Sequence, residues 1–168
     1  ITFDEYFLKQ IENCREGLAI DIIANNTGFN NEEINFLVQR LLNRIIFLRI
    51  CEDREIEKYE TLKHIKSYDE LKALFVRSDK KYNSGLFDFI EDNFSLNIKI
   101  NPGILISIFN ELYYPQSPYD FSVVDPAILS QIYERYLGSK INIVDDHTIS
   151  VVQEPEVAAS SGVVPTPK

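Results

Sequence analysis

The chain has 168 residues, of which 45% are hydrophobic and 26% are charged, and its formal net charge at pH 7 is −9. This length suits one domain with a sizeable core, and the composition excludes both a disordered and a membrane-spanning chain. Binding to a DNA phosphate backbone without regard to base sequence needs clustered Lys and Arg. The acidic balance therefore predicts weak DNA binding, or none, for this chain alone.

Two absences in the sequence bear on where the protein acts and on whether the chain is a fragment. No apolar run approaches the ~20 residues of a bilayer crossing, and no signal peptide follows Ile1, so we expect a cytoplasmic protein with no membrane partner. The sequence also contains no methionine. We therefore expect the chain to be a fragment of a longer protein.

The N-terminal part predicts two long helices. Between Phe3 and Ala24 apolar residues recur every three or four positions, as on one face of an amphipathic helix. Asn30 or Asn31, with Glu33 in the following turn, supplies the cap of a second helix that runs to about Glu55. This second helix is the most apolar segment, so we expect it to be the central element.

Three shorter helices follow in the sequence. Ser67 and Glu70 form a capping box, which predicts a helix over residues 67–81. An Asn-Pro-Gly sequence opens a short helix over residues 101–112, and an Asp-Pro pair opens another over residues 125–138, where a glycine ends it.

The pattern changes after the last helix. Apolar and polar residues alternate on both sides of an Asp-Asp-His turn, which predicts a β-hairpin over residues 139–154. The Ala, Ser, Gly and Pro residues of 155–168 cannot bury enough surface to order themselves. We expect a mainly α protein, with a multi-helix bundle over residues 1–138, a small C-terminal β-hairpin and a flexible tail.

Charged residues lie on the apolar side of the second helix. Arg49 falls within the apolar stripe, and Glu52 and Asp53 follow three and four residues later on the same side. Because a lone buried guanidinium is costly, we expect Arg49 to pair with an acid. A catalytic or metal-binding carboxylate pair is one interpretation. We favour a structural ionic cluster, because no His or third carboxylate lies within local reach.

Three further arginines, Arg40, Arg44 and Arg54, are placed by the same helical spacing on the opposite, outward side. They are candidate contacts to a DNA backbone. Nearby acidic residues also allow the simpler interpretation of a solvated charged face.

Other residue types with chemical potential give weaker patterns. Cys14 and Cys51 lack a CxxC or His companion, so we expect buried free thiols. His64 and His147 have no catalytic or metal-ligand partner in sequence, and we expect surface positions. An aromatic group predicts either a packed loop or a base-stacking platform. Its members are Tyr113, Tyr114, Tyr119, Phe121, Tyr133 and Tyr136. We predict no catalytic residue, no metal site and no cofactor for this chain.

Several sequence runs, in their order along the chain, resemble one family. They are residues 41–54, 82–87, 112–121 and 132–138. These runs are similar to the helical region that precedes the methyltransferase domain in type IIG restriction–modification enzymes and related phage-defence adenine methyltransferases. Residues 162–168 resemble the opening motif of that domain, with Gly162, Thr166 and Pro167 at the matching positions. In the family this motif lies over bound S-adenosylmethionine, although Val164 and Pro165 stand here where the family has aromatic residues.

The resemblance implies a non-catalytic helical connector within an S-adenosylmethionine-dependent, adenine-N6-specific DNA methyltransferase, with or without a Mg²⁺-dependent endonuclease. The family's Asn-Pro-Pro-Tyr motif does not occur in the sequence, and no convincing nuclease Asp…Glu-x-Lys pattern occurs either, so we expect this chain neither to methylate nor to cut DNA. DNA would be contacted through the longer protein, with methyltransferase and nuclease domains as neighbours. The alternative is a free-standing α-helical protein-interaction module.

Overall fold

The computed structural model describes residues 2–82, 86–87, 95, 97–117, 120–145 and 148–153. Within them the order of elements is α1 (Phe3–Asn25), α2 (Asn31–Asp53), the 3-10 helix η1 (Leu62–His64), α3 (Tyr68–Tyr82), α4 (Pro102–Glu111), α5 (Pro126–Leu137), β1 (Ser139–Asp145) and β2 (Thr148–Gln153). The prediction of a mainly α protein is confirmed. Residues 155–168, the predicted flexible tail, lie outside the described residues.

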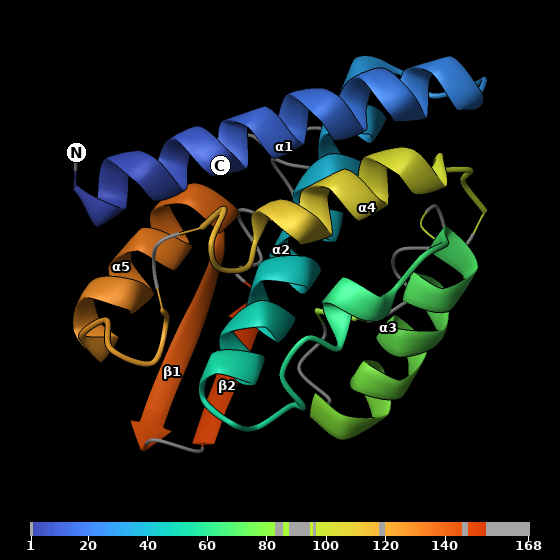
Figure 1. Cartoon of the computed structure of the whole chain (residues 1–168). Helices are drawn as coiled ribbons and strands as arrows, with labels where there is room; N and C mark the ends of the chain where they lie inside the picture. The colour runs from blue at the N-terminus through green and yellow to red at the C-terminus, as the bar shows by residue number, and fades with distance from the viewer. Residues whose placement is uncertain are drawn as a thin grey trace.

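Helix α2 is the centre of the fold. It runs through the middle of the molecule, with α5 on one side and α3 on the other (Figure 1). Seventeen of its 23 residues are buried, so apolar and polar positions alike face other elements. Beyond its first turns, where residues 31, 32 and 35 are exposed, α2 has no solvent face of its own.

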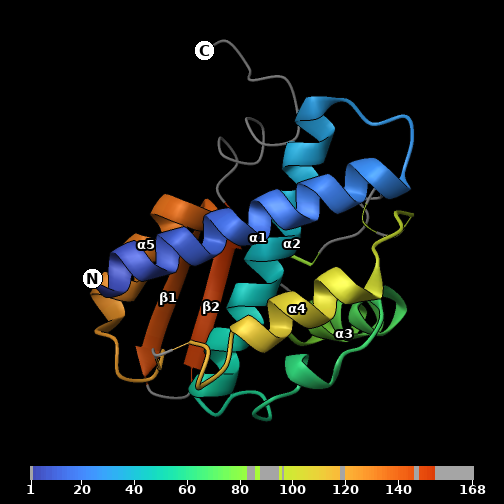
Figure 2. The same cartoon turned by 45° about the horizontal axis from the view of Figure 1, so that its top comes forward.

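Helices α1 and α4 lie over one side of α2 (Figures 1 and 2). The apolar stripe of α1 is fully buried at Phe7, Ile11, Leu18 and Ile22, as its spacing predicted. A Cβ atom added at Gly17 of α1 would lie 2.9 Å from the tip of Ile104 of α4. The two helices therefore approach closely at this glycine.

The helix ends follow local capping chemistry. Asn30 and Glu33 form a reciprocal capping box at the start of α2, with hydrogen bonds of 2.8 and 2.9 Å. The Asp125 carboxylate accepts from the backbone N–H groups of Ala127 and Ile128 at the start of α5. Gly138 ends α5 with a φ of +76°, which glycine adopts at little cost.

Strands β1 and β2 form a two-stranded antiparallel sheet that follows α5 directly. The register pairs residue 141 with residue 151, and an irregularity lies between residues 143 and 145. In Figure 1 both strands lie on the α5 side of α2.

The capping box gives a first prediction. Replacing Asn30 by Ala leaves a backbone N–H at the start of α2 without its acceptor, and we expect the free energy of unfolding to fall by about 1 kcal/mol. Urea denaturation followed by circular dichroism measures this loss. The neighbouring substitution Asn31→Ala, at an exposed position, should change stability by less than about 0.5 kcal/mol; equal effects would contradict the capping role.

The two cysteines give a second prediction. Both are buried, and burial raises the pKa of each thiol to about 12. Only the thiolate reacts rapidly with disulfide reagents, so at pH 8 the native protein should not react with Ellman's reagent. In urea both thiols should react. Rapid reaction of the folded protein would show that one thiol is accessible.

Candidate functional site: the Arg49 cluster

The last turn of α2 carries the charged residues Arg49, Glu52 and Asp53, which we call the Arg49 cluster. The spacing of three and four residues puts all three on one side of the helix. The Arg49 side chain is 2% exposed, and one of its terminal nitrogens, Nη1, forms an ion pair with Asp53. Its Nε donates a 3.0 Å hydrogen bond to the carbonyl oxygen of Leu112, just beyond α4. Asp53 is one of the partners that the sequence spacing predicted.

Aromatic rings surround the Arg49 guanidinium. Its central carbon lies 4.3 Å from the ring centre of Tyr113, 5.3 Å from that of Tyr59 and 6.0 Å from that of Phe121. The electron-rich faces of such rings attract a cation, most strongly where water is excluded. They compensate part of the hydration that Arg49 loses on burial.

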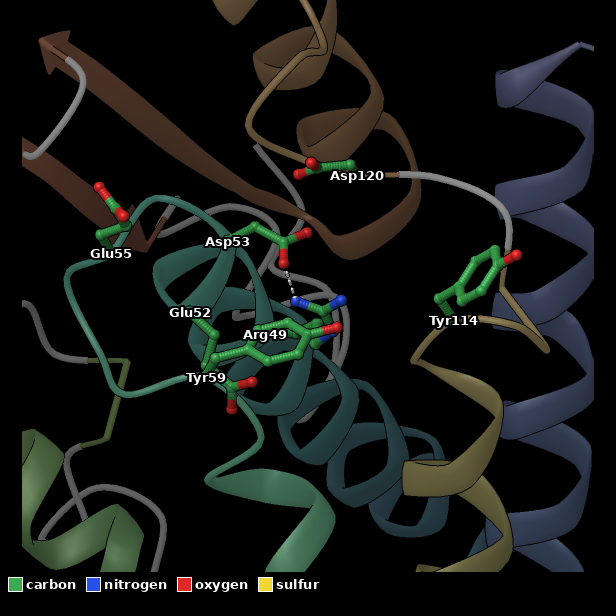
Figure 3. Close-up of a pocket in the computed structure, with 7 residues that line it drawn as sticks. All are labelled: Arg49, Glu52, Asp53, Glu55, Tyr59, Tyr114 and Asp120. Atoms are coloured by element: carbon green, nitrogen blue, oxygen red, sulfur yellow. Dashed lines mark hydrogen bonds and ion pairs between the residues drawn. The ribbon is translucent and has the colours of Figure 1, made fainter.

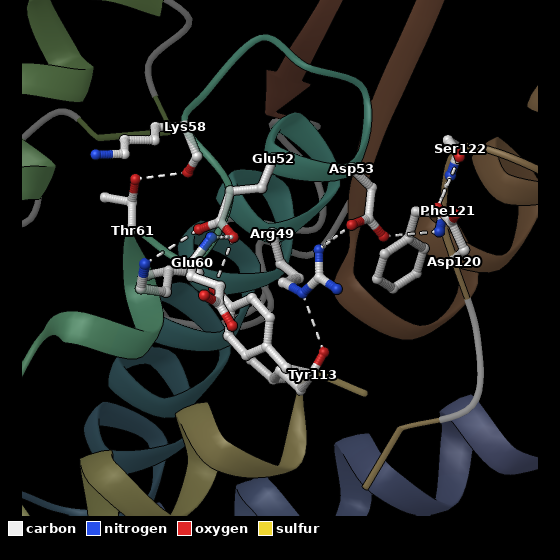
Figure 4. A network of polar contacts seen from close by, with 12 residues as sticks. Arg49, Glu52, Asp53, Lys58, Glu60, Thr61, Tyr113, Asp120, Phe121 and Ser122 are labelled. Carbon is white, nitrogen blue, oxygen red and sulfur yellow. Dashed lines mark hydrogen bonds and ion pairs between the residues drawn. The ribbon is translucent and has the colours of Figure 1, made fainter. Parts of the chain in front are cut away.

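Glu52 holds the connection between α2 and η1 (Figure 4). Its Oε1 accepts hydrogen bonds from the Glu60 backbone N–H at 2.9 Å and from the Tyr113 hydroxyl at 2.6 Å. Its Oε2 accepts from the Leu62 backbone N–H at 3.1 Å. One carboxylate thus joins the end of α2 to η1 and to the segment after α4.

Asp53 reaches a fourth part of the chain. Its Oδ1 pairs with Arg49, and its Oδ2 accepts a 2.8 Å hydrogen bond from the Phe121 backbone N–H in the segment before α5. All four carboxylate oxygens of Glu52 and Asp53 are therefore engaged by donors within the chain. This bonding occupies the oxygens that a metal ion or a reacting proton would need.

Burial and pairing act in opposite directions on the charges of the cluster. Burial raises the pKa of Glu52, against hydrogen bonds from Tyr113 and two backbone amides, and raises that of Asp53, against its bond to Arg49. Burial disfavours the charged form of Arg49, but the hydrogen bond and charge of Asp53, with the smaller contributions of Tyr113 and Glu52, leave its pKa raised. Burial and the charge of Glu52 raise the pKa of Tyr113, which stays a hydroxyl donor.

A cavity of about 450 Å³ opens beside the cluster (Figure 3). Its lining comprises Arg49, Glu52, Asp53, Glu55, Tyr59, Tyr114 and Asp120. In the described part of the chain, no group of three or more His, Cys, Asp or Glu side chains is placed to hold a metal ion.

The predicted outward position of Arg40, Arg44 and Arg54 is wrong. Their exposed fractions are 5%, 0% and 5%. Arg40 lies over the ring of Phe36, while Arg44 lies over the ring of Phe75 and donates from Nε to the Leu86 carbonyl oxygen at 2.8 Å. The physical reason is that α2 is covered on all sides, so the side opposite its apolar stripe also packs against protein. Buried guanidinium groups cannot reach a DNA backbone.

The aromatic group divides into two kinds of position. Tyr113, Phe121 and Tyr133 are fully buried, which agrees with the packed-loop interpretation, whereas Tyr114 is 76% exposed. His64 is exposed, as predicted, and its ring Nδ1 lies 2.7 Å from the carbonyl oxygen of Glu60. Several residues of interest lie outside the described part: Tyr119, His147, Gly162, Thr166 and Pro167.

Sequence reasoning missed the residues that complete the cluster from outside α2. Tyr59, Leu62 and Leu112 carried no signal, because their roles depend on backbone atoms or on contacts between distant segments. Tyr113 was noted only as one of several aromatic residues. Its position directly after a predicted helix end, at the start of a turn, was the one local sign that it could face the core.

The cluster gives a third prediction. Arg49→Ala leaves the Asp53 carboxylate buried without its partner, and we expect a loss of about 3–5 kcal/mol in the free energy of unfolding. Urea denaturation measures it. Arg77→Ala removes an exposed arginine of α3 and should stay within about 0.5 kcal/mol of the parent. An unchanged midpoint for Arg49→Ala would exclude a structural role for the cluster.

Comparison with known proteins gives one informative match. The chain is 41% identical, over 99% of its length, to the type II restriction enzyme and methyltransferase RM.Eco57I of Escherichia coli. The chain spans 17% of the length of that protein. The resemblance to restriction–modification enzymes is therefore confirmed, for a segment that is a small part of the relative.

No protein-family model matches the chain, and no solved structure matches it. Among the described residues, none of the helices combines the length and the apolar composition that a membrane crossing requires.

Proposed function

We propose, from its match to a segment of a restriction enzyme and methyltransferase, that this chain is a non-catalytic helical connector within a restriction–modification DNA adenine-N6 methyltransferase. The connector would hold the neighbouring methyltransferase and nuclease modules at a fixed distance and angle. The name of the relative gives it both activities, and the chain corresponds to a minor part of its length.

The observation that carries this proposal is the bonding of the Arg49 cluster. Through side chains of one helical turn, the end of α2 is bonded to η1, to the segment after α4 and to the segment before α5. A spacer transmits position only if its own elements do not move against one another. Directional bonds from α2 to three other parts of the chain, most of them shielded from water, meet that requirement.

In this proposal the chemistry belongs to other parts of the longer protein. S-adenosylmethionine would bind in the methyltransferase domain, with Gly162, Thr166 and Pro167 near it, and Mg²⁺ would serve a nuclease domain. DNA would be bound by the longer, cytoplasmic protein. The buried state of Arg40, Arg44 and Arg54 supports this assignment, because it removes three candidate phosphate contacts from the chain.

The test compares two arginine variants in the full-length protein. We expect Arg49→Ala to lower the rate of methyl transfer from radiolabelled S-adenosylmethionine to DNA, measured at a temperature where the variant remains folded. Its dissociation constant for S-adenosylmethionine should stay unchanged, because the cofactor site itself is intact. Arg77→Ala is the matched control and should behave as the parent.

Two outcomes would overturn the connector. One is a full-length Arg49→Ala protein, with the expected loss of stability, that methylates DNA at the parental rate. The other is an isolated chain that binds S-adenosylmethionine tightly and methylates DNA, since the methyltransferase activity would then reside in this segment. Calorimetric titration measures the binding of S-adenosylmethionine, and the same radiolabel assay measures methyl transfer.

A further inference from the structure

The Arg49 guanidinium presents to the cavity beside the cluster one nitrogen that has no acceptor among the described residues. Arg49 uses Nε and Nη1 for its bonds to Leu112 and Asp53, and its second terminal nitrogen, Nη2, has no hydrogen-bond acceptor among the described residues. Arg49 lines the cavity, and Figure 3 shows its guanidinium directed into the space between Asp53, Asp120 and Tyr114. Hydrogen bonds from a charged donor are stronger than those between neutral groups. A ligand that offers an oxygen acceptor here would bond to Nη2 in place of water.

The charge of the cavity lining indicates the charge of the ligand. Four carboxylates and one guanidinium line it, which leaves a formal charge of −3. The carboxylates of Glu52 and Asp53 are engaged inside the chain, whereas Glu55 and Asp120 are exposed residues at the rim. Phosphate would be repelled from this rim, and a cation would be attracted.

The aromatic residues at the opening favour the same kind of ligand. Tyr59 is 48% exposed and Tyr114 is 76% exposed, and both line the cavity. Tyrosine rings bind the apolar stem of an Arg or Lys side chain and attract its charged end. Exposed tyrosines are also enriched where one protein surface receives another.

We propose that this cavity is a docking site for a basic segment of polypeptide. An Arg or Lys side chain of that segment lies between Tyr59 and Tyr114 with its charge near Asp120 and Glu55, and a carbonyl oxygen of the same segment accepts a hydrogen bond from Arg49 Nη2. The volume of about 450 Å³ accommodates one such side chain with its adjoining backbone. The choice of a neighbouring part of the longer protein as the source rests on the proposed connector function.

The experiment titrates the isotope-labelled 168-residue chain with acetyl-Gly-Ser-Arg-Ser-Gly-amide at low salt and follows its NMR spectrum. We expect saturable shifts of the Arg49 guanidinium signals and the Tyr114 amide, and weaker binding as NaCl screens the rim. The same peptide with Gln in place of Arg should bind much more weakly. Equal binding of the two peptides would overturn the proposal.

Two variants test the assigned residues. Asp120→Asn removes a rim charge while keeping an oxygen acceptor for the turn at Ser122, and Tyr114→Ala removes one wall; each should weaken binding by about three- to tenfold. The controls Asp69→Asn and Val123→Ala, at exposed positions outside the cavity lining, should bind as the parent. Unchanged affinity in both cavity variants, with native spectra, would contradict the proposal.

Two more titrations decide the nature and source of the occupant. Adenosine should not bind; if it shifted the cavity signals at lower concentration than the peptide, the site would be one for a neutral base. In the full-length protein the neighbouring segment should occupy the cavity and reduce peptide binding, and equal binding there would exclude an occupant in cis. These results are independent of methyl-transfer rates, so the docking site and the connector can fail separately.

Discussion

The burial of one guanidinium, that of Arg49, determines how the helices of this protein meet. Removing such a charge from water costs several kcal/mol unless acceptors and a counter-charge replace the lost hydration. The replacements come from Asp53 in the same helix, from the carbonyl of Leu112 after α4 and from the ring of Tyr113. Because these groups belong to segments far apart in the sequence, the guanidinium is stabilised only when the segments are assembled together.

The two carboxylates extend this dependence to the connection before η1, to the first residue of η1 and to the segment before α5. Backbone N–H groups in such segments have no helical or sheet partner and must find another acceptor when they are buried. Glu52 supplies it for residues 60 and 62, and Asp53 supplies it for residue 121. The carboxylates of α2 therefore accept hydrogen bonds from these backbone N–H groups, as the carbonyl oxygens of a neighbouring strand do in a sheet. This bonding explains how irregular connections can still hold adjacent helices in one arrangement.

The sequence predicted features that depend on neighbouring residues, and it failed for features that depend on contacts between distant segments. Caps at Asn30 and Asp125 and the final glycine of α5 act within a few residues, so their patterns located the helices well. The outward position of Arg40, Arg44 and Arg54 was wrong, because a single apolar stripe was taken to mean a single buried face. Tyr113 and Phe121 lie more than sixty residues from the carboxylates they contact, so no spacing rule could bring them to the cluster. Glu55 and Glu60 have φ values of +63° and +69°, in a connection without the glycine or asparagine that usually announces such a backbone.

The arginines inside the core also change the electrostatic character of the surface. The chain has 17 Lys and Arg against 26 Asp and Glu, and four of those arginines, including Arg49, are almost wholly buried. The positive charge of these arginines is directed to internal contacts, such as those with aromatic rings, carbonyl oxygens and Asp53. Among the acidic residues whose side chains the structure describes, Glu52 alone is buried as a whole residue. Such a surface repels a phosphate backbone and attracts basic protein segments. In the proposed connector, this distribution of charge favours contacts with neighbouring protein over contacts with a nucleic acid.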